Sequence, residues 1–383
     1  MKKKALIAVN FIGFTHFLWD DIDLLNKMGY TITLIGDNEK NEINTLNVLQ
    51  EKHVKFINVK IDSKSPISKN NINAYKFYKE ILHNEHFDLI HCHTPIVGLF
   101  MRLAAIKCRH HGTKVIYTTH GLAYTHLSSN KEFIIYHTIE SFASGFCDAI
   151  ITINLEDYNN ARKLHCKKVY HINGVGVDVE RYKNICIDKE RYREQIGIPN
   201  DKIMILSIGE LSTRKNHVVI VDAISKLKDK DNYVFAICGR KMTGSGTGDL
   251  IQKMAEEKGV NVKFLGFRND IPNIVHCADI GAIPSIREGL GLSGIETLSA
   301  GVPMIGSDVQ GIREYIINGK TGFLCEPFDS KAFAEAIDKL SDKEYRASLR
   351  TNCLEIVKKF DKKISVAQRE KIYKEILLQT KQL

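Results

Sequence analysis

Short runs of aliphatic and β-branched residues alternate with longer stretches of helical spacing along most of the chain. Before residue 174, seven runs have the continuous apolar character of buried strands: KALIAVN, YTITLIG, VKFINVK, FDLIHCH, KVIYTTH, AIITIN and KVYHIN. Most are separated by a helical pattern such as FLWDDIDLLNKMG, which ends on a glycine suited to a helix C-cap. Alternating strands and helices predict an α/β fold with a parallel sheet.

A polar stretch interrupts this pattern, and a second series of apolar runs follows it. The stretch from Asn173 to about Asp201 has no long apolar run. After it come IMILSIGE, YVFAICG, VKFLGF, DIGAIPS, VPMIGSD and TGFLCEP, and the residues from about Ser330 onward are helical and charged. We therefore expect two Rossmann-like domains, 1–173 and 174–361, that face a central ligand cleft, with a C-terminal helix at about 362–383 completing the first.

Composition agrees with a folded protein of two domains. The chain has 383 residues, of which 44% are hydrophobic and 26% are charged, and these values are typical of folded domains. No apolar run approaches the length of a membrane-spanning helix. The start, MKKKALIAVNFIGF, lacks the cleavage site of a signal peptide and predicts a first strand instead. Nine cysteines without a CxxC pair favour reduced thiols, so we expect a cytoplasmic protein.

The net charge of +9 narrows the choice of partners only slightly. The lysines and arginines are spread along the chain and form no basic tail, so we expect no nucleic-acid partner. A mildly basic surface would suit anionic lipid or a phosphorylated substrate, and it would equally serve solubility alone.

The stretch REGLGLSGIETLSAG, residues 287–301, predicts a ligand loop that runs into a helix. Its glycines Gly289, Gly291 and Gly294 would let a ligand approach the backbone closely. The unpaired N–H groups and partial positive charge at the start of the helix would suit a phosphate.

Two glutamates with seven residues between them frame this loop. Glu288 lies in the loop and can face a sugar. Glu296 lies one turn into the helix and can accept hydrogen bonds from a ribose diol, but its spacing from Ser293 also fits a capping box. The sequence leaves both roles of Glu296 open.

A second segment, ILSIGELSTRKNHVVIVDAI, predicts a strand, a turn at Gly209 and a helix. Arg214 and Lys215 come directly before that helix, at the carboxyl edge of the predicted sheet. Two cations in this position would form a clamp for a diphosphate, although basic residues in loops are often merely solvated.

Taken together, these motifs resemble those of a retaining glycosyltransferase of the GT-B fold, in family four. The similarity is strongest to the bacterial transferases of exopolysaccharide and capsule synthesis, and it covers nearly the whole chain. It rests on the Glu-x7-Glu motif at Glu288 and Glu296, and on the segments GELSTRKNH, HCHTPIVGLFMRLAA, YTTHGL, ITINLEDY, NGVGVDVERY, FLGFRNDI and VQGIREYI.

The resemblance implies a nucleotide diphosphate sugar as donor, with uridine as the expected base, and a lipid-linked glycan as acceptor. The transferred group would be a hexose or an N-acetylhexosamine. Work on a lipid-linked acceptor implies peripheral contact with the inner face of the membrane. No metal or other cofactor is expected. The sequence supplies no obvious carboxylate nucleophile, and the resemblance implies front-face attack in which the leaving phosphate helps to take the proton of the acceptor.

Residue roles follow from the same resemblance. Arg214 and Lys215 would stabilise the departing diphosphate, and Glu288 would contact the donor sugar. Glu296 would hold the ribose hydroxyls, and His120, in TTHG, would lie beside the reacting sugar. The implied catalytic residues are His120, Arg214, Lys215 and Glu288. The implied donor-binding residues are Gly13, Gly209, Arg214, Lys215, Glu288, Gly289, Leu290, Gly291, Leu292 and Glu296.

Two departures from the family pattern leave details open. The first loop, NFIGFTH, has only Gly13 where many relatives carry a Gly-Gly pair, so its contact with an acceptor is open. Leu290 stands where many relatives carry Phe, so the shape of the sugar pocket is open too.

Three further patterns could indicate a metal or phosphate site, but each fits an ordinary structural role better. Asp21 and Asp23 form an Asp-x-Asp pair inside an amphipathic helix, where solvated charges are expected. His91 and His93 share one face of a strand, which fits a role in a cleft or in packing better than a metal site. The glycines of residues 239–250 lack the Gly-Lys-Thr of a phosphate loop and fit a flexible loop over the nucleotide.

Other classes of protein remain as alternatives. A sugar-nucleotide epimerase would share the fold but lack an acceptor site, and a glycan-assembly subunit would have lost catalysis. The presence of both glutamates and the basic pair argues against the latter. A dehydrogenase is disfavoured because no GxGxxG follows the first strand.

Overall fold

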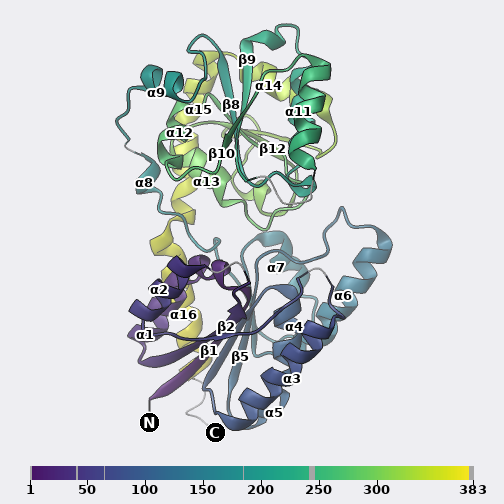
Figure 1. Cartoon of the computed structure of the whole chain (residues 1–383), viewed down its shortest axis with the longest axis vertical. Coiled ribbons are helices and arrows are strands. Elements are labelled where there is room, and N and C mark those ends of the chain that lie inside the picture. Colours follow the sequence, from purple (N-terminus) through teal and green to yellow (C-terminus); the bar gives the residue numbers. More distant parts are fainter. Residues whose placement is uncertain (1, 40–41, 64, 184, 241–245, 379–383) are drawn as a thin grey trace. The chain divides into compact units, whose positions relative to one another are not determined.

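The computed structural model describes residues 2–39, 42–63, 65–183, 185–240 and 246–378. The chain divides into two compact units. The N-terminal unit comprises residues 1–175 and 363–383, and the C-terminal unit comprises residues 176–362. Each unit is built around one parallel sheet, and Figure 1 shows the elements of both.

The N-terminal unit has a seven-stranded parallel sheet in the order β3-β2-β1-β4-β5-β6-β7. Its strands are β1 (Lys3–Phe11), β2 (Tyr30–Asp37), β3 (Lys55–Asn58), β4 (Leu89–His93), β5 (Lys114–Thr119), β6 (Ala149–Thr152) and β7 (Val169–His171). Its helices are α1 (Trp19–Lys27), α2 (Ile43–Glu51), α3 (Lys69–Asn84), α4 (Pro95–Ala104), α5 (Ile106–His110), α6 (Asn130–Ser144), α7 (Leu155–Ala161) and α16 (Lys362–Leu378). The 3-10 helix η1 (Ile12–Phe17) follows β1.

The C-terminal unit has a six-stranded parallel sheet in the order β10-β9-β8-β11-β12-β13. Its strands are β8 (Ile203–Ile208), β9 (Tyr233–Cys238), β10 (Val262–Gly266), β11 (Ile280–Ile283), β12 (Met304–Ser307) and β13 (Gly322–Cys325). Its helices are α8 (Glu180–Lys183), α9 (Lys189–Gln195), α10 (Val218–Ile224), α11 (Thr247–Lys258), α12 (Ile271–Cys277), α13 (Leu292–Ser299), α14 (Ser330–Lys339) and α15 (Lys343–Ile356). The 3-10 helices are η2 (Thr213–Lys215), η3 (Lys230–Asn232), η4 (Gln310–Glu314) and η5 (Val357–Phe360).

Both sheets confirm the strands predicted from the apolar runs, because each of the thirteen runs contains a strand. The central strands are buried on both faces, as parallel sheets require, and residues 5–9 of β1 are fully buried. Helix α4 lies so close to β5 that a Cβ atom on Gly98 would come within 2.5 Å of the Tyr117 ring. Glycine at position 98 therefore sets the distance between this helix and the sheet.

Strand order places a topological switch point in each sheet. In the C-terminal unit the chain moves outward from β8 in one direction and from its neighbour β11 in the other. In the N-terminal unit β1 and β4 form the corresponding pair. Ligands of open α/β sheets bind beyond the carboxyl ends of such strands, so the loops after these four strands are where a site is expected.

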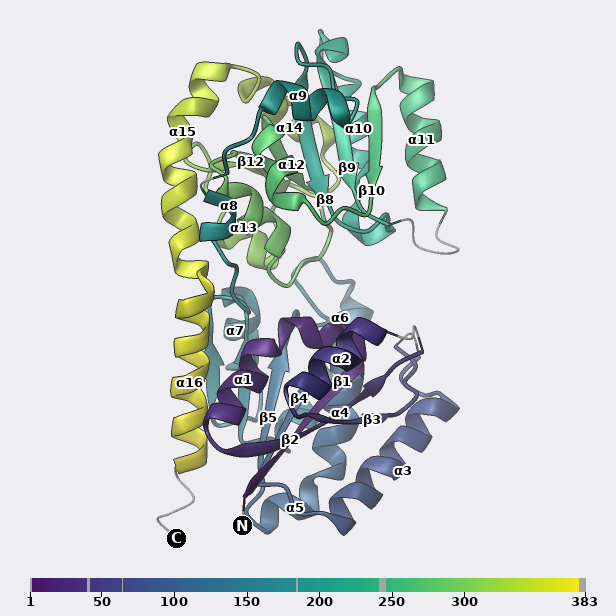
Figure 2. The same cartoon turned by 60° about the vertical axis from the view of Figure 1, so that its left-hand side comes forward.

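Helix α16 is joined to the N-terminal unit through a buried polar network that the sequence did not predict. Figure 2 shows α16 beside α1, and the two helices meet where Arg369 Nε lies 3.3 Å from Asp21 Oδ1. The Tyr373 hydroxyl donates to the same carboxylate oxygen at 2.9 Å. Asp21 is only 2% exposed, so the expectation of a solvated charge is wrong at this position. Asp23, by contrast, is an exposed partner of Lys52.

Two further expectations concern membranes and thiols. None of the helices in the described part of the chain combines the length and apolarity needed to cross a bilayer. All nine cysteines are free, and seven of them are buried.

We predict that Tyr373→Phe destabilises the protein by about 1–3 kcal/mol, because it leaves the buried Asp21 carboxylate short of a hydrogen bond. Tyr170→Phe is a matched control, because the Tyr170 hydroxyl also contacts α16, at Glu375, but in an exposed setting. Urea unfolding followed by circular dichroism compares the two variants. Equal effects would contradict the structural role of the buried network.

Candidate functional site

The loops that follow β8 and β11 in the C-terminal unit bring the predicted cations and one predicted carboxylate together. After β8 the chain passes Gly209 and forms η2, which carries Arg214 and Lys215. After β11 it forms a loop that carries Glu288 and leads into α13. The two loops are joined through their backbones, because Ile286 N–H donates to the carbonyl oxygen of Arg214 at 2.9 Å.

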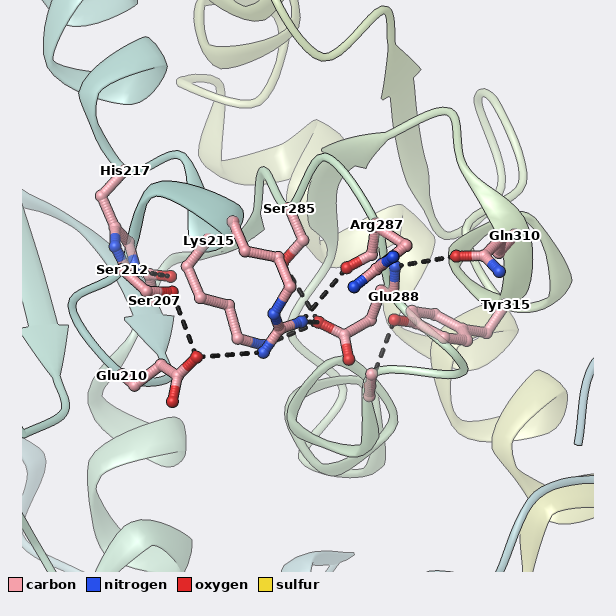
Figure 3. Close-up of polar contacts among 12 residues, drawn as sticks. Ser207, Glu210, Ser212, Lys215, His217, Ser285, Arg287, Glu288, Gln310 and Tyr315 are labelled. Carbon is pink, nitrogen blue, oxygen red and sulfur yellow. Dashed lines mark hydrogen bonds and ion pairs between the residues drawn. The ribbon is translucent and has the colours of Figure 1, made fainter. Parts of the chain in front are cut away.

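The centre of the site is an ion-pair cluster around Glu288 (Figure 3). Its Oε2 atom accepts from Lys215 Nζ at 2.7 Å and lies 3.2 Å from an Arg214 guanidinium nitrogen. The Ser285 hydroxyl donates to the same oxygen at 3.2 Å. Burial raises the pKa of Glu288, but the Lys215 ammonium and the Arg214 guanidinium outweigh burial and hold that pKa below its usual value. The carboxylate is therefore ionised.

Arg214 is held by a second carboxylate as well. Its guanidinium donates to Glu210 Oε1 at 3.2 Å and to the carbonyl oxygen of Arg287 at 3.1 Å. The Arg214 side chain is 36% exposed, whereas that of Lys215 is 13% exposed. Lys215 is thus the more enclosed of the two cations.

Local backbone chemistry explains how Lys215 reaches this position. A Cβ atom at residue 209 would lie 3.0 Å from Lys215 Cε, so glycine there leaves room for the lysine side chain against the backbone. Asn216 has a left-handed backbone with φ 52°, a conformation that Asn tolerates better than most residues. Its side chain donates to the carbonyl oxygen of Pro327 at 2.6 Å, which fixes the turn after Lys215.

The glycine loop is held by the segment after β12. Glu288 N–H donates to Gln310 Oε1 at 3.1 Å, and the Tyr315 hydroxyl donates to the Gly291 carbonyl oxygen at 3.2 Å (Figure 3). Gly291 has φ +77°, which favours glycine. Leu290 is only 3% exposed, so a contact between this residue and a donor would have to come from its backbone.

Helix α13 begins differently from the prediction. It starts at Leu292 after Gly291, and no side chain caps it, so the predicted capping box of Ser293 and Glu296 is wrong. The left-handed Gly291 turns the chain into the helix two residues earlier than expected. Glu296 instead accepts a hydrogen bond from the Tyr182 hydroxyl. Burial raises the pKa of this carboxyl, while Tyr182 and Arg181 oppose the rise.

In the N-terminal unit, three histidines lie at the carboxyl ends of β4 and β5. The rings of His91 and His93 lie 4.1 Å apart, which confirms that they share one face of the strand. His93 Nδ1 lies 3.1 Å from Nε2 of His120, which follows β5. Gly13 is in η1, whose Phe14 ring meets the His120 ring edge-on at 4.7 Å between centroids. The loop containing Gly13 thus lies beside His120.

The hydrogen bonds of the histidines fix the position of each ring proton. The Tyr373 hydroxyl donates to Asp21, so its oxygen accepts from His91 Nδ1 at 2.7 Å. His91 Nε2 then accepts from the Thr118 hydroxyl at 2.7 Å. His93 Nε2 is buried and has no hydrogen-bond partner among the described residues.

A buried N–H without a partner is rarer than a buried acceptor without one, so the His93 proton belongs on Nδ1. His93 then donates to His120 Nε2, and His120 carries its own proton on Nδ1. Burial lowers the pKa values of His91 and His120 to about 3, so both rings stay neutral near neutral pH. Arg369 adds a smaller effect at His91, and His91 and then Arg369 add smaller effects at His120. His120 therefore offers a hydrogen-bond donor rather than a charge.

Metal chemistry finds no support in this arrangement. In the part of the chain that the structure describes, no group of three or more His, Cys, Asp or Glu side chains is arranged to hold a metal ion. The metal-free character of the protein remains a prediction.

Of the glycine-rich segment 239–250, residues 241–245 lie outside the described residues, and α11 begins at Thr247. The predicted flexible loop over the nucleotide thus lies partly outside the described residues, and the end of the segment forms the start of α11 instead of a loop.

Two Rossmann-like units, each with a parallel sheet and with polar residues beyond the carboxyl ends of its strands, are characteristic of the GT-B class of glycosyltransferases. Residues 18–181 match the family described as "Glycosyltransferase Family 4", and residues 188–360 match "Glycosyl transferases group 1". The putative glycosyltransferase EpsD of Bacillus subtilis (strain 168) is 36% identical over 288 residues, which are 73% of this chain and 74% of EpsD. The chain therefore belongs to the glycosyltransferase family that these two descriptions, group 1 and family 4, define.

Two other similarities are informative. The Escherichia coli UDP-Gal:alpha-D-GlcNAc-diphosphoundecaprenol alpha-1,3-galactosyltransferase is 28% identical over 317 residues, 76% of each chain. The crystal structure of Anabaena Alr3699/HepE in complex with UDP and glucose has a TM-score of 0.77 at 20% identity and covers 97% of this chain and 100% of its own. The latter supports the fold alone.

Sequence reasoning missed several residues that build the site. Glu210, Gln310 and Tyr315 hold Arg214 and the glycine loop, and Tyr182 holds Glu296. All four lie in segments that resemble family blocks, namely GELSTRKNH, VQGIREYI and NGVGVDVERY, but the sequence did not indicate what each of them contacts. His93 was expected, with His91, to lie in a cleft or in packing, but its contact with His120 was not predicted.

We predict that long-range ¹H–¹⁵N spectra of histidine-labelled protein show His91, His93 and His120 as neutral rings protonated at Nδ1. Single His→Gln variants assign the resonances. Because burial lowers their pKa values far below the usual 6.5, the three signals stay unchanged between pH 8 and 5. His16, which is exposed, is the matched control. A His120 ring that carries its proton on Nε2, or that titrates in this range, would contradict the assignment.

Proposed function

We propose that this glycosyltransferase moves a sugar from a nucleotide diphosphate donor to a lipid-linked glycan during synthesis of a bacterial surface polysaccharide. The name of the Escherichia coli relative supports the classes of substrate, because it gives UDP-galactose as donor and a diphosphoundecaprenol-linked acceptor. Uridine is the proposed base, and the transferred group is a hexose or an N-acetylhexosamine.

One observation carries the proposal: the carboxylate of a loop residue contacts both cations beyond the switch point of the C-terminal sheet. Glu288 contacts both Lys215 and Arg214, and its pKa stays low despite burial. A diphosphate offers the same kind of oxygens with more charge, so it can displace Glu288 from the cations. Glu288 would then be free to accept a hydrogen bond from the donor sugar.

The proposed chemistry uses these groups for one substitution. The bond between the anomeric carbon and the diphosphate oxygen breaks, and Lys215 and Arg214 stabilise the charge that develops on that oxygen. The acceptor hydroxyl attacks from the same face, and its proton passes to the leaving diphosphate, so the configuration is retained. His120 would donate from Nδ1 to the sugar, and Glu296 would accept from the ribose hydroxyls.

A lipid-linked acceptor implies work at the inner face of the membrane, with no metal ion needed. An epimerase of the same fold remains the second candidate, and the order of substrates separates the two. An epimerase converts the donor alone, whereas the proposed transferase releases nucleoside diphosphate in proportion to the glycan extended.

Lys215→Ala is expected to lower turnover about a hundredfold or more, because removing one preorganised donor to a developing charge costs about 3–4 kcal/mol of barrier. Lys226→Ala is the control, since Lys226 is an exposed partner of Asp222. Release of nucleoside diphosphate measures turnover, and melting temperature verifies folding. Normal turnover in Lys215→Ala would refute the proposed role of the clamp.

Glu288→Gln and Glu296→Gln are expected to differ in what they lose. Without the Glu288 charge the cations stay available, so free nucleoside diphosphate binds at least as tightly, while transfer falls about a hundredfold. Glu296→Gln loses a charged acceptor for the ribose, so nucleotide affinity falls about tenfold or more. Calorimetric titration with UDP and turnover with full donor measure both effects. An equal loss of UDP affinity would show that the division of roles is wrong.

A further inference from the structure

Helix α6 of the N-terminal unit, which is labelled in Figure 1, exposes many large apolar side chains. We call its exposed large apolar residues the α6 surface: Phe133, Ile134, Ile135, Tyr136, Ile139 and Phe142, which are 37–63% exposed. Leu127, in the preceding loop, is 42% exposed. Contiguous apolar exposure of this kind marks a site of interaction with a protein or a membrane.

The helix holds this surface in place without a partner. At its base, the Glu140 carboxylate accepts from the Arg102 guanidinium at 2.7 Å, and both side chains are buried. The Arg102 guanidinium also lies 4.1 Å from the centre of the Tyr117 ring on β5. At the other end, Ser129 and Glu132 form a capping box. Both ends of α6 are thus fixed while its middle turns remain exposed.

The distribution of the exposed residues around the helix indicates what covers them. Phe133, Ile134, Ile135 and Tyr136 are consecutive, and at about 100° per residue they point to all sides of the helix. A flat protein face could cover only one side. The stretch 133–139 also contains no Asp, Glu, Lys or Arg. An apolar medium that encloses the helix, such as the boundary of lipid headgroups and acyl chains, fits both facts.

The position of α6 links it to the site of the same unit. The helix begins ten residues after His120, beyond the carboxyl end of β5. Within the connecting loop, the Tyr124 ring packs against Phe133 and His137, at 5.2 and 5.4 Å between centroids. The surface and the histidines therefore lie at the same edge of the sheet, where a glycan attached to membrane lipid would have to arrive.

We propose that the α6 surface inserts into the interfacial layer of an anionic phospholipid membrane and so brings the edge of the sheet with His120 to lipid-linked acceptors. The net charge of +9 complements the negative surface of such a membrane. This inference rests on the proposed function for its purpose, but the binding itself needs neither donor nor acceptor.

The test uses the full chain and vesicles of phosphatidylglycerol and phosphatidylethanolamine. The variant Ile134→Ser/Ile135→Ser/Ile139→Ser changes three exposed residues of the surface, and Ile72→Ser/Leu250→Ser/Phe328→Ser changes three exposed apolar residues on other elements. Flotation should show vesicle binding by the wild type and the control, and at least a tenfold weaker partition of the α6 variant. Equal melting temperatures verify folding.

Three outcomes overturn the proposal. The first is a wild type that does not bind the vesicles, and the second is an α6 variant that binds them as well as the control. The third is a wild-type dimer that the α6 substitutions dissociate without changing vesicle binding, which would assign the surface to a second copy of this chain.

Transfer assays separate this inference from the proposed function. On a short-chain, water-soluble acceptor the α6 variant should keep wild-type turnover, and on acceptor embedded in vesicles it should lose about tenfold. Vesicle binding without any glycosyl transfer would refute the proposed function but not the insertion of the α6 surface into membranes. Normal transfer to embedded acceptor by the α6 variant would refute only the proposed role of the α6 surface in reaching that acceptor.

Discussion

The contact between Glu288 and the two cations is the interaction on which the candidate site depends. A buried carboxylate is costly unless it is paired, and here Lys215, Arg214 and Ser285 pair it. The same contact gathers two cations that would repel one another. Glu288 thus keeps the clamp assembled in the absence of substrate, with a carboxylate in the place proposed for a diphosphate. Exchange of one anion for another explains how the loop could respond to the donor.

The surrounding residues serve this exchange. Gly209 leaves space for Lys215, and Gln310 and Tyr315 fix the loop on either side of the carboxylate. In the other unit, the helix at the end of the chain performs a comparable task. Tyr373 of α16 connects Asp21 to His91, so the position of the His91 ring proton depends on a residue far away in sequence.

Much of the architecture could be predicted from the sequence because it depends on local patterns. Buried parallel strands are continuous apolar runs, and all thirteen were found in that way. The contact of Arg214 and Lys215 with Glu288 was not predicted; it follows from the strand order in the structure, where β8 and β11 are neighbours at the switch point. The resemblance to family four supplied the roles, which the structure leaves as proposals.

The failures share one physical cause, which is that contacts distant in sequence leave no local pattern. Asp21 has the spacing of a solvated helix charge and is buried because Arg369 and Tyr373 cover it. Ser293 and Glu296 have the spacing of a capping box, but Tyr182, which is distant in sequence, donates a hydrogen bond to the Glu296 carboxylate. The sequence of α6 gave no warning either, because exposure on all sides of the helix is visible only once the rest of the unit is in place.

The exchange of Glu288 for a diphosphate at the two cations can be measured as the number of protons that the protein takes up when it binds UDP. If a diphosphate displaces Glu288 from Lys215 and Arg214, the pKa of this buried carboxyl rises, and Glu288 takes up a proton in mildly acidic solution. Titration calorimetry with UDP at pH 5.5, in buffers of different ionisation enthalpy, gives the number of protons bound. The account predicts more proton uptake by the wild type than by Glu288→Gln, which cannot titrate at this position. Equal uptake by the two proteins would contradict it.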